Sequence, residues 1–417
     1  NGILYTGSSG IWQTVWLEPV SRAHVEKVDI TPNAGAGRFT IVPRVTGTRA
    51  SRVELTARPS GGGPVVARAS GQVGSSLTVA PAHPRLWSPA SPYLYHFDIR
   101  LLDRNGNALD TVGSYAGLRS VGLVKDSKGR ERVALNGRVL FQHGPLDQGF
   151  WPDGIYTAPT DSALRSDLAQ TKALGFNMIR KHMKVEPDRW YYWADKLGLM
   201  VWQDMPSLPI DLSSPPGSNS PPTAAQRQNY QAELAEMIEA HRSTTSIVTW
   251  VAFNEGWGEF GTRQVAGDIL AQDPTRLVDA SSGVNCCYSK PDTGAGQIYD
   301  DHTYVGPGTP TAGAARAAVD GEYGGLGLVL PGHVWPGRPQ AYEMEKTKAQ
   351  LTKRYGQLSD TLANAVTAHG LSAGIYTQTT DVENEVNGLL SYDRRVVKAN
   401  TAAVRAHNLR VIRAGSQ

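Results

Sequence analysis

Residues 247–255 read Ile-Val-Thr-Trp-Val-Ala-Phe-Asn-Glu, an almost continuous apolar run that ends in two polar side chains. Such a run, without alternation, is typical of a strand that is buried on both faces of a parallel sheet. Asn254 and Glu255 follow the run directly. A carboxylate beside a buried strand is costly unless it is paired or functional. This stretch therefore predicts a central parallel strand whose carboxyl end carries chemistry.

Similar apolar runs occur on both sides of this stretch, from about residue 133 to the C-terminus. Apolar runs alternate there with segments in which apolar residues recur at helical spacing. The expected helices span residues 162–174, 188–197, 224–241, 262–271, 342–369 and 394–411. Strands that alternate with helices indicate a parallel sheet with crossover connections. A strand count close to eight favours a closed (β/α)8 TIM barrel over an open sheet.

A different pattern precedes the barrel, from about residue 23 to residue 122. Short alternating runs such as 25–30, 39–45 and 53–57 read as strands, and turn-forming clusters such as 60–64 separate them. About seven such strands in ~100 residues fit an immunoglobulin-like β-sandwich. We therefore expect a multidomain chain in which this sandwich is followed by the barrel.

The first twenty residues contain an apolar stretch that includes Trp12, Trp16 and Leu17 and reads as a strand. A strand without neighbours cannot bury its faces. We therefore expect either the remnant of a preceding domain or a segment that docks on a later domain. The predicted domains are a remnant at 1–20, a sandwich at 21–122 and a barrel at 123–417.

Composition excludes several classes of protein. The 417 residues contain 41 Lys and Arg against 38 Asp and Glu, so no basic footprint for nucleic acid is expected. No apolar run reaches the ~18 residues of a membrane-spanning helix. Two cysteines cannot form a disulfide scaffold or a cysteine-rich zinc site. Cys286 and Cys287 are adjacent, and we expect two reduced thiols rather than a strained bond between neighbours.

Glu255 and Glu322 are the carboxylates on which a chemical prediction depends, because they follow different strands of one barrel mouth. Two facing carboxylates suit cleavage of a glycosidic bond: one protonates the leaving oxygen and the other attacks the anomeric carbon. A gap of ~5–5.5 Å predicts retention of configuration and ~6.5–9.5 Å predicts inversion. The carboxylate that donates the proton needs a raised pKa, which the charge of the other carboxylate is expected to supply. A structural ion pair is the alternative for each glutamate.

Other polar and aromatic residues follow the predicted strands and are candidates for binding a sugar. Those that could bind hydroxyls or orient the carboxylates are His143, Asp147, Arg180, His182, Asp204, Asn254, His302, Tyr304 and Gln378. Trp257 and Trp335 are candidate stacking platforms, with core packing as the alternative. No helix carries a His-x-x-x-His pair, so we expect no metal in the reaction.

The stretch from Ile247 to Gly258 resembles the acid/base strand of glycoside hydrolase family 2, which includes β-galactosidases, β-mannosidases and β-glucuronidases. Residues 320–325, Asp-Gly-Glu-Tyr-Gly-Gly, resemble its nucleophile strand. The resemblance implies that Glu255 is the general acid/base, that Glu322 is the nucleophile and that Asn254 contacts the sugar 2-hydroxyl. It also places Arg180 near the nucleophile.

The resemblance covers nearly the whole chain but has departures. Residues 5–18 resemble the end of the family's N-terminal jelly roll, most of which is missing. The predicted eighth strand at 375–381 lacks the tryptophan that is common there. The Asn-x-Lys signature with which glucuronidases hold a carboxylate is not seen.

The leading prediction is a retaining exo-glycosidase, most similar to a β-galactosidase. The alternatives are an arabinoside- or galactofuranoside-type glycosidase and a catalytically silent carbohydrate-binding protein on the same scaffold. A barrel enzyme that uses phosphate or a cofactor is disfavoured, because no glycine-rich phosphate loop occurs in the required context. We expect a carbohydrate substrate, no cofactor, no nucleic acid and no membrane. A homo-oligomer is left open, and a secreted bacterial enzyme is the expectation for location.

Overall fold

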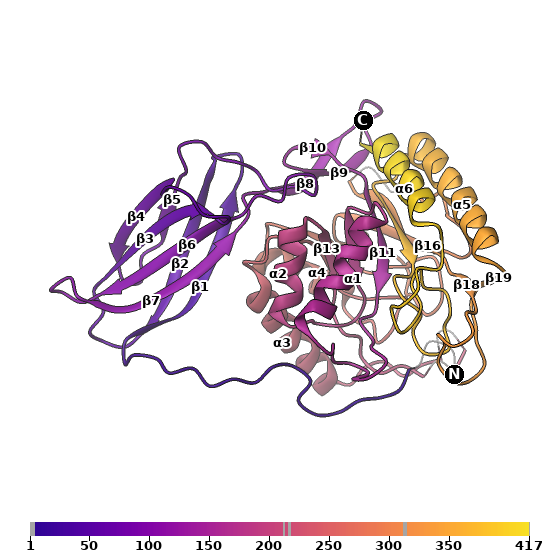
Figure 1. The fold of residues 1–417 in the computed structure, drawn as a ribbon, viewed down its shortest axis with the longest axis horizontal. Coiled ribbons are helices and arrows are strands. Elements are labelled where there is room, and N and C mark those ends of the chain that lie inside the picture. Colours follow the sequence, from indigo (N-terminus) through magenta and orange to yellow (C-terminus); the bar gives the residue numbers. More distant parts are fainter. Residues whose placement is uncertain (1–4, 212, 216–217, 312–314, 417) are drawn as a thin grey trace.

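The computed structural model describes residues 5–416 except 212, 216–217 and 312–314. Figure 1 shows two bodies side by side, a β-sandwich and a larger α/β body. The sheet of strands β8 to β10 connects them on one side. On the other side, the N-terminal segment runs from the α/β body to the sandwich.

The sandwich consists of two antiparallel sheets with the strand orders β1-β2-β5 and β4-β3-β6-β7. Their bounds are β1 His24–Asn33, β2 Arg38–Thr46, β3 Arg52–Pro59, β4 Ala67–Gln72, β5 Leu77–Val79, β6 Tyr95–Leu102 and β7 Ala108–Ala116. Alternate residues of these strands point inward, so Phe39, Leu55 and Phe97 meet in one apolar core. The predicted sandwich is confirmed.

The α/β body is an eight-stranded sheet with the order β15-β14-β13-β12-β11-β20-β17-β16, and all its strand pairs are parallel. The strands are β11 Gln142–Asp147, β12 Met178–Lys181, β13 Met200–Asp204, β14 Ile247–Val251, β15 Leu277–Asp279, β16 Ile298–Thr303, β17 Ala317–Gly324 and β20 Ala373–Thr377. The helices are α1 Asp161–Ala173, α2 Asp188–Leu197, α3 Ala224–His241, α4 Thr262–Gln272, α5 Lys348–His369 and α6 Thr401–Gly415. Contacts between β15 and β16 nearly close the sheet, which confirms the predicted barrel.

The short sheet of β8 Val121–Lys125, β9 Glu131–Leu135 and β10 Arg138–Val139 lies between sandwich and barrel. Val133 and Leu135 of β9 share an apolar cluster with the barrel strands. Arg119 precedes this sheet, is almost fully buried and donates hydrogen bonds to the carbonyls of Thr245 and Ile247. The sandwich is therefore bonded to the start of β14, the strand that leads to Glu255.

Two helices begin later than their apolar spacing predicts. The helix expected at 342–369 begins at Lys348, because β19 (Glu343–Glu345) pairs with β18 (Leu326–Leu328). The helix expected at 394–411 begins at Thr401, where the side chain of Asn400 caps it. Pairing and capping thus overrode the periodicity at both starts.

Residues 5–20 do not form the predicted strand, and they pair with none of the strands in the part of the chain that the structure describes. The segment docks on the barrel instead: Trp12 packs edge-on against Tyr156 at 4.8 Å, and Gln13 donates to the carbonyl of Val185. Leu17, farther along, is 99% exposed. The origin of residues 1–20 as a jelly-roll remnant stays a prediction, as do the domain boundaries.

None of the helices in the described ranges is both long enough and apolar enough to cross a bilayer.

Candidate active site

Glu255 sits in a tight turn at the carboxyl end of β14. Its φ of 50° lies in the left-handed region, and its N–H donates to the carbonyl of Ser282 at 2.8 Å. Its own carbonyl accepts from the N–H of Tyr288 at 3.0 Å. Gly256 follows, and a Cβ there would lie 1.9 Å from the carbonyl oxygen of Tyr288. The loop after β15 therefore holds the carboxylate of Glu255 at the barrel mouth.

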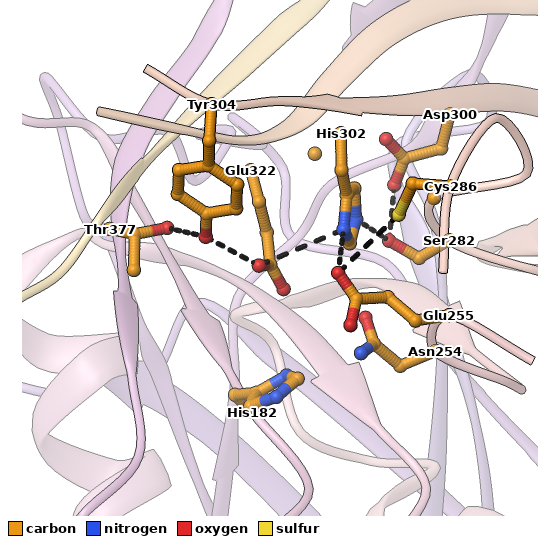
Figure 2. A network of polar contacts seen from close by, with 12 residues as sticks. His182, Asn254, Glu255, Ser282, Cys286, Asp300, His302, Tyr304, Glu322 and Thr377 are labelled. Carbon is orange, nitrogen blue, oxygen red and sulfur yellow. Dashed lines mark hydrogen bonds and ion pairs between the residues drawn. The ribbon is translucent and has the colours of Figure 1, made fainter. Parts of the chain in front are cut away.

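Glu322 lies inside β17 and is 6% exposed. Its Oε2 accepts a hydrogen bond from the hydroxyl of Tyr304 at 2.6 Å, and its Oε1 pairs with Nη1 of Arg180 at 3.5 Å. The hydroxyl of Tyr304 also lies 2.7 Å from Oγ1 of Thr377, as Figure 2 shows. Tyr342 stacks on the ring of Tyr304 with 3.7 Å between centroids. Glu322 is thus held by a cation and a phenol.

Arg180 organises the floor between the two glutamates. It is fully buried, and its Nε and Nη2 donate to the carboxylate of Asp204. Nη2 also donates to Oδ1 of Asn254 at 2.9 Å, which orients the amide beside Glu255. Asp204 in turn accepts from Nδ1 of His182 at 2.8 Å.

One imidazole bridges the two carboxylates. Nδ1 of His302 lies 2.9 Å from Oε1 of Glu255 and 3.7 Å from Oε2 of Glu322. Its Nε2 lies 2.8 Å from Oγ of Ser282, which donates to Asp300 at 2.6 Å. Figure 2 shows this chain of contacts from Asp300 through His302 to both glutamates.

The contact between His302 and Glu255 shifts the pKa of both side chains. Burial would raise the pKa of Glu255, but the hydrogen bond and charge of His302 outweigh it and lower the pKa to about 2. Burial would lower the pKa of His302, but the charge of Glu322 and the hydrogen bond to Glu255 raise it to about 10. The raised pKa expected for Glu255 is therefore wrong, because His302 lies between the carboxylates and favours the ionised form of Glu255.

A cavity of about 200 Å³ opens beside the glutamates. Its walls are Tyr5, Leu146, Gln148, Phe150, Tyr156, His182, Met183, Lys184, Asn254, Glu255, Trp257, Tyr304, Glu322, Tyr342, Thr377 and Glu385. This volume is below the ~300–1,000 Å³ of sites for drug-sized ligands, so the cavity suits a single sugar unit. Carboxylates, amides and aromatic faces together match the hydroxyls and C–H faces of a sugar.

The structure separates the predicted site residues into three groups. His182, Asn254, Glu255, Trp257, Tyr304 and Glu322 line the cavity. Arg180, Asp204, His302 and Gln378 lie behind it and hydrogen-bond to residues of its walls.

The third group lies away from the cavity. His143 is fully buried and contacts the carbonyl of Gly374 and the amide of Asn408. Asp147 is paired with Lys181, and Trp335 packs against the ring of Tyr392. The structure thus shows hydrogen bonds for His143, an ion pair for Asp147 and an aromatic contact for Trp335, all of them away from the cavity.

Several residues of the site were missed. Tyr5, from the N-terminal segment, donates a hydrogen bond to Glu385 and accepts one from Gln148 at 2.8 Å. Glu385 follows the last barrel strand, so its position offered a signal, but nothing in the sequence placed Tyr5 at the mouth. Cys286 was considered only for its redox state, and its Sγ lies 3.6 Å from Oε1 of Glu255.

The chain matches two family profiles. Residues 23–119 match "Glycosyl hydrolases family 2", and residues 151–299 match the TIM barrel domain of the same family. This protein belongs to glycosyl hydrolase family 2. The family 2 barrel match includes Glu255 and ends before Glu322.

Family 2 relatives cover part of the chain, and the chain covers part of each relative. It is 25% identical over 186 residues to a β-galactosidase of Lactococcus lactis, which is 44% of this chain and 18% of that protein. It is 26% identical over 291 residues to a β-galactosidase of Photobacterium profundum, 66% of this chain and 28% of that protein. The match thus spans less than a third of either relative's length.

A solved structure supports the fold. The β-glucuronidase of Lactobacillus rhamnosus superimposes with a TM-score of 0.71 at 17% identity, over 93% of this chain and 68% of the other.

Proposed function

We propose that this protein is a retaining exo-glycosidase that removes a terminal sugar by double displacement. The observation that supports this best is the position of His302 between the two glutamates. Its Nδ1 is 2.9 Å from one carboxylate oxygen and 3.7 Å from the other, which limits their separation to about 6.6 Å. This upper limit includes the ~5–5.5 Å of retaining enzymes and excludes all but the lower edge of the ~6.5–9.5 Å of inverting enzymes.

In the first step, Glu322 attacks the anomeric carbon of the bound sugar. Its oxygen forms a bond to this carbon while the bond to the leaving oxygen breaks. The proton held on Nδ1 of His302 passes to Glu255, and the leaving oxygen takes it from Glu255 as the bond breaks, so Glu255 is a carboxylate again at the end of this step. Tyr304 and Arg180 hold the carboxylate of Glu322 in place for this attack.

In the second step, the sugar is an ester of Glu322, which is then uncharged. Glu255 takes a proton from a water as the water oxygen attacks the anomeric carbon, and that proton passes to His302. The bond to Glu322 breaks, so both glutamates and the imidazole return to their starting states. Two displacements at one carbon retain its configuration.

The charges of the cavity favour a neutral sugar, with a β-galactoside as the first choice. Glu385 adds a third carboxylate to the wall, with Glu255 and Glu322. Lys184 donates to the carbonyls of Gly149 and Tyr156 and pairs with Glu186, so its charge is already engaged. The relatives in Lactococcus lactis and Photobacterium profundum bear the name β-galactosidase. Arabinosides and galactofuranosides are the runners-up.

A panel of nitrophenyl glycosides tests the proposal, together with NMR of the first anomer released. We expect hydrolysis of the β-galactoside with the β-anomer appearing first. The matched β-galacturonide differs only at C6, and like-charge repulsion should reduce its kcat/KM by at least ~10-fold. Release of the α-anomer first would contradict retention. Binding of galactose without hydrolysis of any glycoside would favour the silent binding protein.

A further inference from the structure

Three different donor atoms converge on the acid/base side of the cavity. Oε1 of Glu255, Sγ of Cys286 and Nδ1 of His302 all lie within 4.8 Å of one another. We propose that these three atoms form a binding site for a thiophilic divalent cation such as Zn²⁺, whose occupation inhibits the enzyme. This site goes beyond the proposed glycosidase function, which needs no metal.

The distances are close to those of a tetrahedral zinc site. Zinc bonds of ~2.0–2.3 Å to nitrogen, oxygen and sulfur give distances of ~3.4–3.6 Å between neighbouring ligand atoms. Sγ of Cys286 is 3.6 Å from Oε1 of Glu255, which matches. Nδ1 of His302 is 2.9 Å from the same oxygen, so this pair would open by only ~0.5 Å.

The donor set selects the kind of metal. A thiolate and an imidazole suit Zn²⁺ and similar soft or borderline ions, whereas Mg²⁺ and Ca²⁺ prefer oxygen ligands. Negative charge surrounds the site, because Glu322 lies 3.7 Å from Nδ1 of His302 and Asp300 lies behind it through Ser282. A divalent cation would replace the ligand protons there, and binding releases them.

The ligands are held in place from behind, as in metal sites of known proteins. Nε2 of His302 contacts Oγ of Ser282, which leaves Nδ1 facing Glu255 and Cys286. The N–H of His302 donates to Oδ1 of Asn285 at 2.8 Å, and the amide of Asn285 donates back to the carbonyl of His302 at 2.9 Å. Figure 2 shows the three ligand side chains pointing toward one another. The imidazole is therefore already oriented toward the other two ligands.

Inhibition follows from the identity of one ligand. Oε1 of Glu255, the carboxylate proposed to exchange the proton with the leaving oxygen, would be bound to the cation. The acid/base group would then have no proton to deliver to the leaving oxygen. Three protein ligands leave a fourth coordination position, and Glu255 also lines the cavity. The cation should therefore be removable by a chelator.

Cys287 provides a matched control. It neighbours Cys286 and also hydrogen-bonds Glu255, but its side chain is exposed and is not one of the three converging donors. Chelator-treated full-length wild type, Cys286→Ala and Cys287→Ala would be compared by equilibrium dialysis with Zn²⁺. Co²⁺ would be added as a spectroscopic probe, since a sulfur-to-cobalt charge-transfer band appears only when a thiolate is a ligand. Circular dichroism would check that each variant is folded.

We expect one Zn²⁺ per chain and the sulfur–cobalt band in wild type and in Cys287→Ala. Cys286→Ala should lose the band and bind Zn²⁺ at least ~10–100-fold more weakly. Hydrolysis by wild type should fall with Zn²⁺ and return with a chelator. Equal binding by wild type and Cys286→Ala, or loss only in Cys287→Ala, would overturn the site. Because dialysis does not depend on turnover, failure of the glycosidase proposal would remain distinguishable.

Discussion

The two halves of the cavity, which we call the nucleophile half around Glu322 and the acid/base half around Glu255 after the roles proposed for them, are held by different kinds of contacts. Glu322 is inside β17. Its partner Arg180 belongs to β12, and its partner Tyr304 directly follows β16. Glu255 instead sits in a left-handed turn after β14, and its partners are the imidazole of His302 and the thiol of Cys286. Glu322 itself therefore rests on a strand, whereas Glu255 rests on a turn and is contacted by a loop thiol and by one residue of β16, His302.

The difference matches the tasks that we propose for the two carboxylates. A nucleophile must be held in one orientation, which hydrogen bonds from a buried guanidinium and a phenol hydroxyl provide. An acid/base group must exchange a proton twice per turnover, which requires a partner that holds the proton. The partner of Glu255 is a titratable imidazole, whereas the guanidinium beside Glu322 never loses its proton.

The largest effect is expected on the nucleophile half. Glu322→Ala should reduce turnover of a nitrophenyl glycoside by at least ~10⁴-fold, because no covalent intermediate can form. Azide should not restore a product of retained configuration. Kinetics and NMR of the products check this, and activity near that of wild type would sink the assignment.

Glu255→Ala should break the other half with a smaller loss. Loss of general acid/base help costs ~10²–10⁴-fold, and the cost should be greatest for glycosides with poor leaving groups. Added azide should accept the sugar from Glu322 and restore turnover as the β-glycosyl azide. Steady-state kinetics with a series of leaving groups measures this. An α-configured azide product would exchange the roles of the two glutamates.

Tyr304→Phe should weaken the nucleophile half without breaking it. The variant removes the hydrogen bond to Oε2 of Glu322, while Arg180 stays in place. Loss of one such donor to a reacting group costs about 10²-fold in kcat. Tyr342→Phe keeps the stacked ring and is the control, with an expected change below ~3-fold. Equal losses in both variants would assign Tyr304 a packing role.

The smallest effect is expected on stability, from the ion pair between Asp273 and Arg276 near the start of β14. Burial would raise the pKa of Asp273, but the charge of Arg276 and the hydrogen bonds from Thr275 and Trp250 outweigh it and lower the pKa to about 2. A folded pKa below the unfolded value of 3.8 contributes stability that is present above about pH 4 and is lost as pH falls toward 2.

Asp273→Asn should therefore cost about 2 kcal/mol of unfolding free energy at pH 7 and much less near pH 2–3. Urea unfolding of wild type and variant at both pH values measures the difference. Asp268→Asn, on the exposed face of α4, is the control. A loss that is the same at both pH values would show that packing rather than charge causes it.

Much of the barrel could be predicted because the signals are local. The run before Asn254 and Glu255 is apolar throughout, and parallel strands bring their carboxyl ends to one mouth whatever their separation in sequence. Helices α2 and α3 have the bounds that their spacing predicts. Helices α5 and α6 begin later, since β19 pairing and the Asn400 cap depend on neighbours that spacing cannot reveal.

The sequence by itself determined the fold class, the family and the two glutamates at the barrel mouth, because periodicity and strand-end position depend on near neighbours along the chain. Only the tertiary structure decided that His302 lies between the carboxylates, that Cys286 touches Glu255 and that Tyr5 closes the wall beside Glu385. These contacts involve loops and a terminal segment as well as one residue of β16, and their positions follow from packing and hydrogen bonding across the whole molecule. The protonation of the site follows from such contacts, since burial and charge at a few ångströms set each pKa.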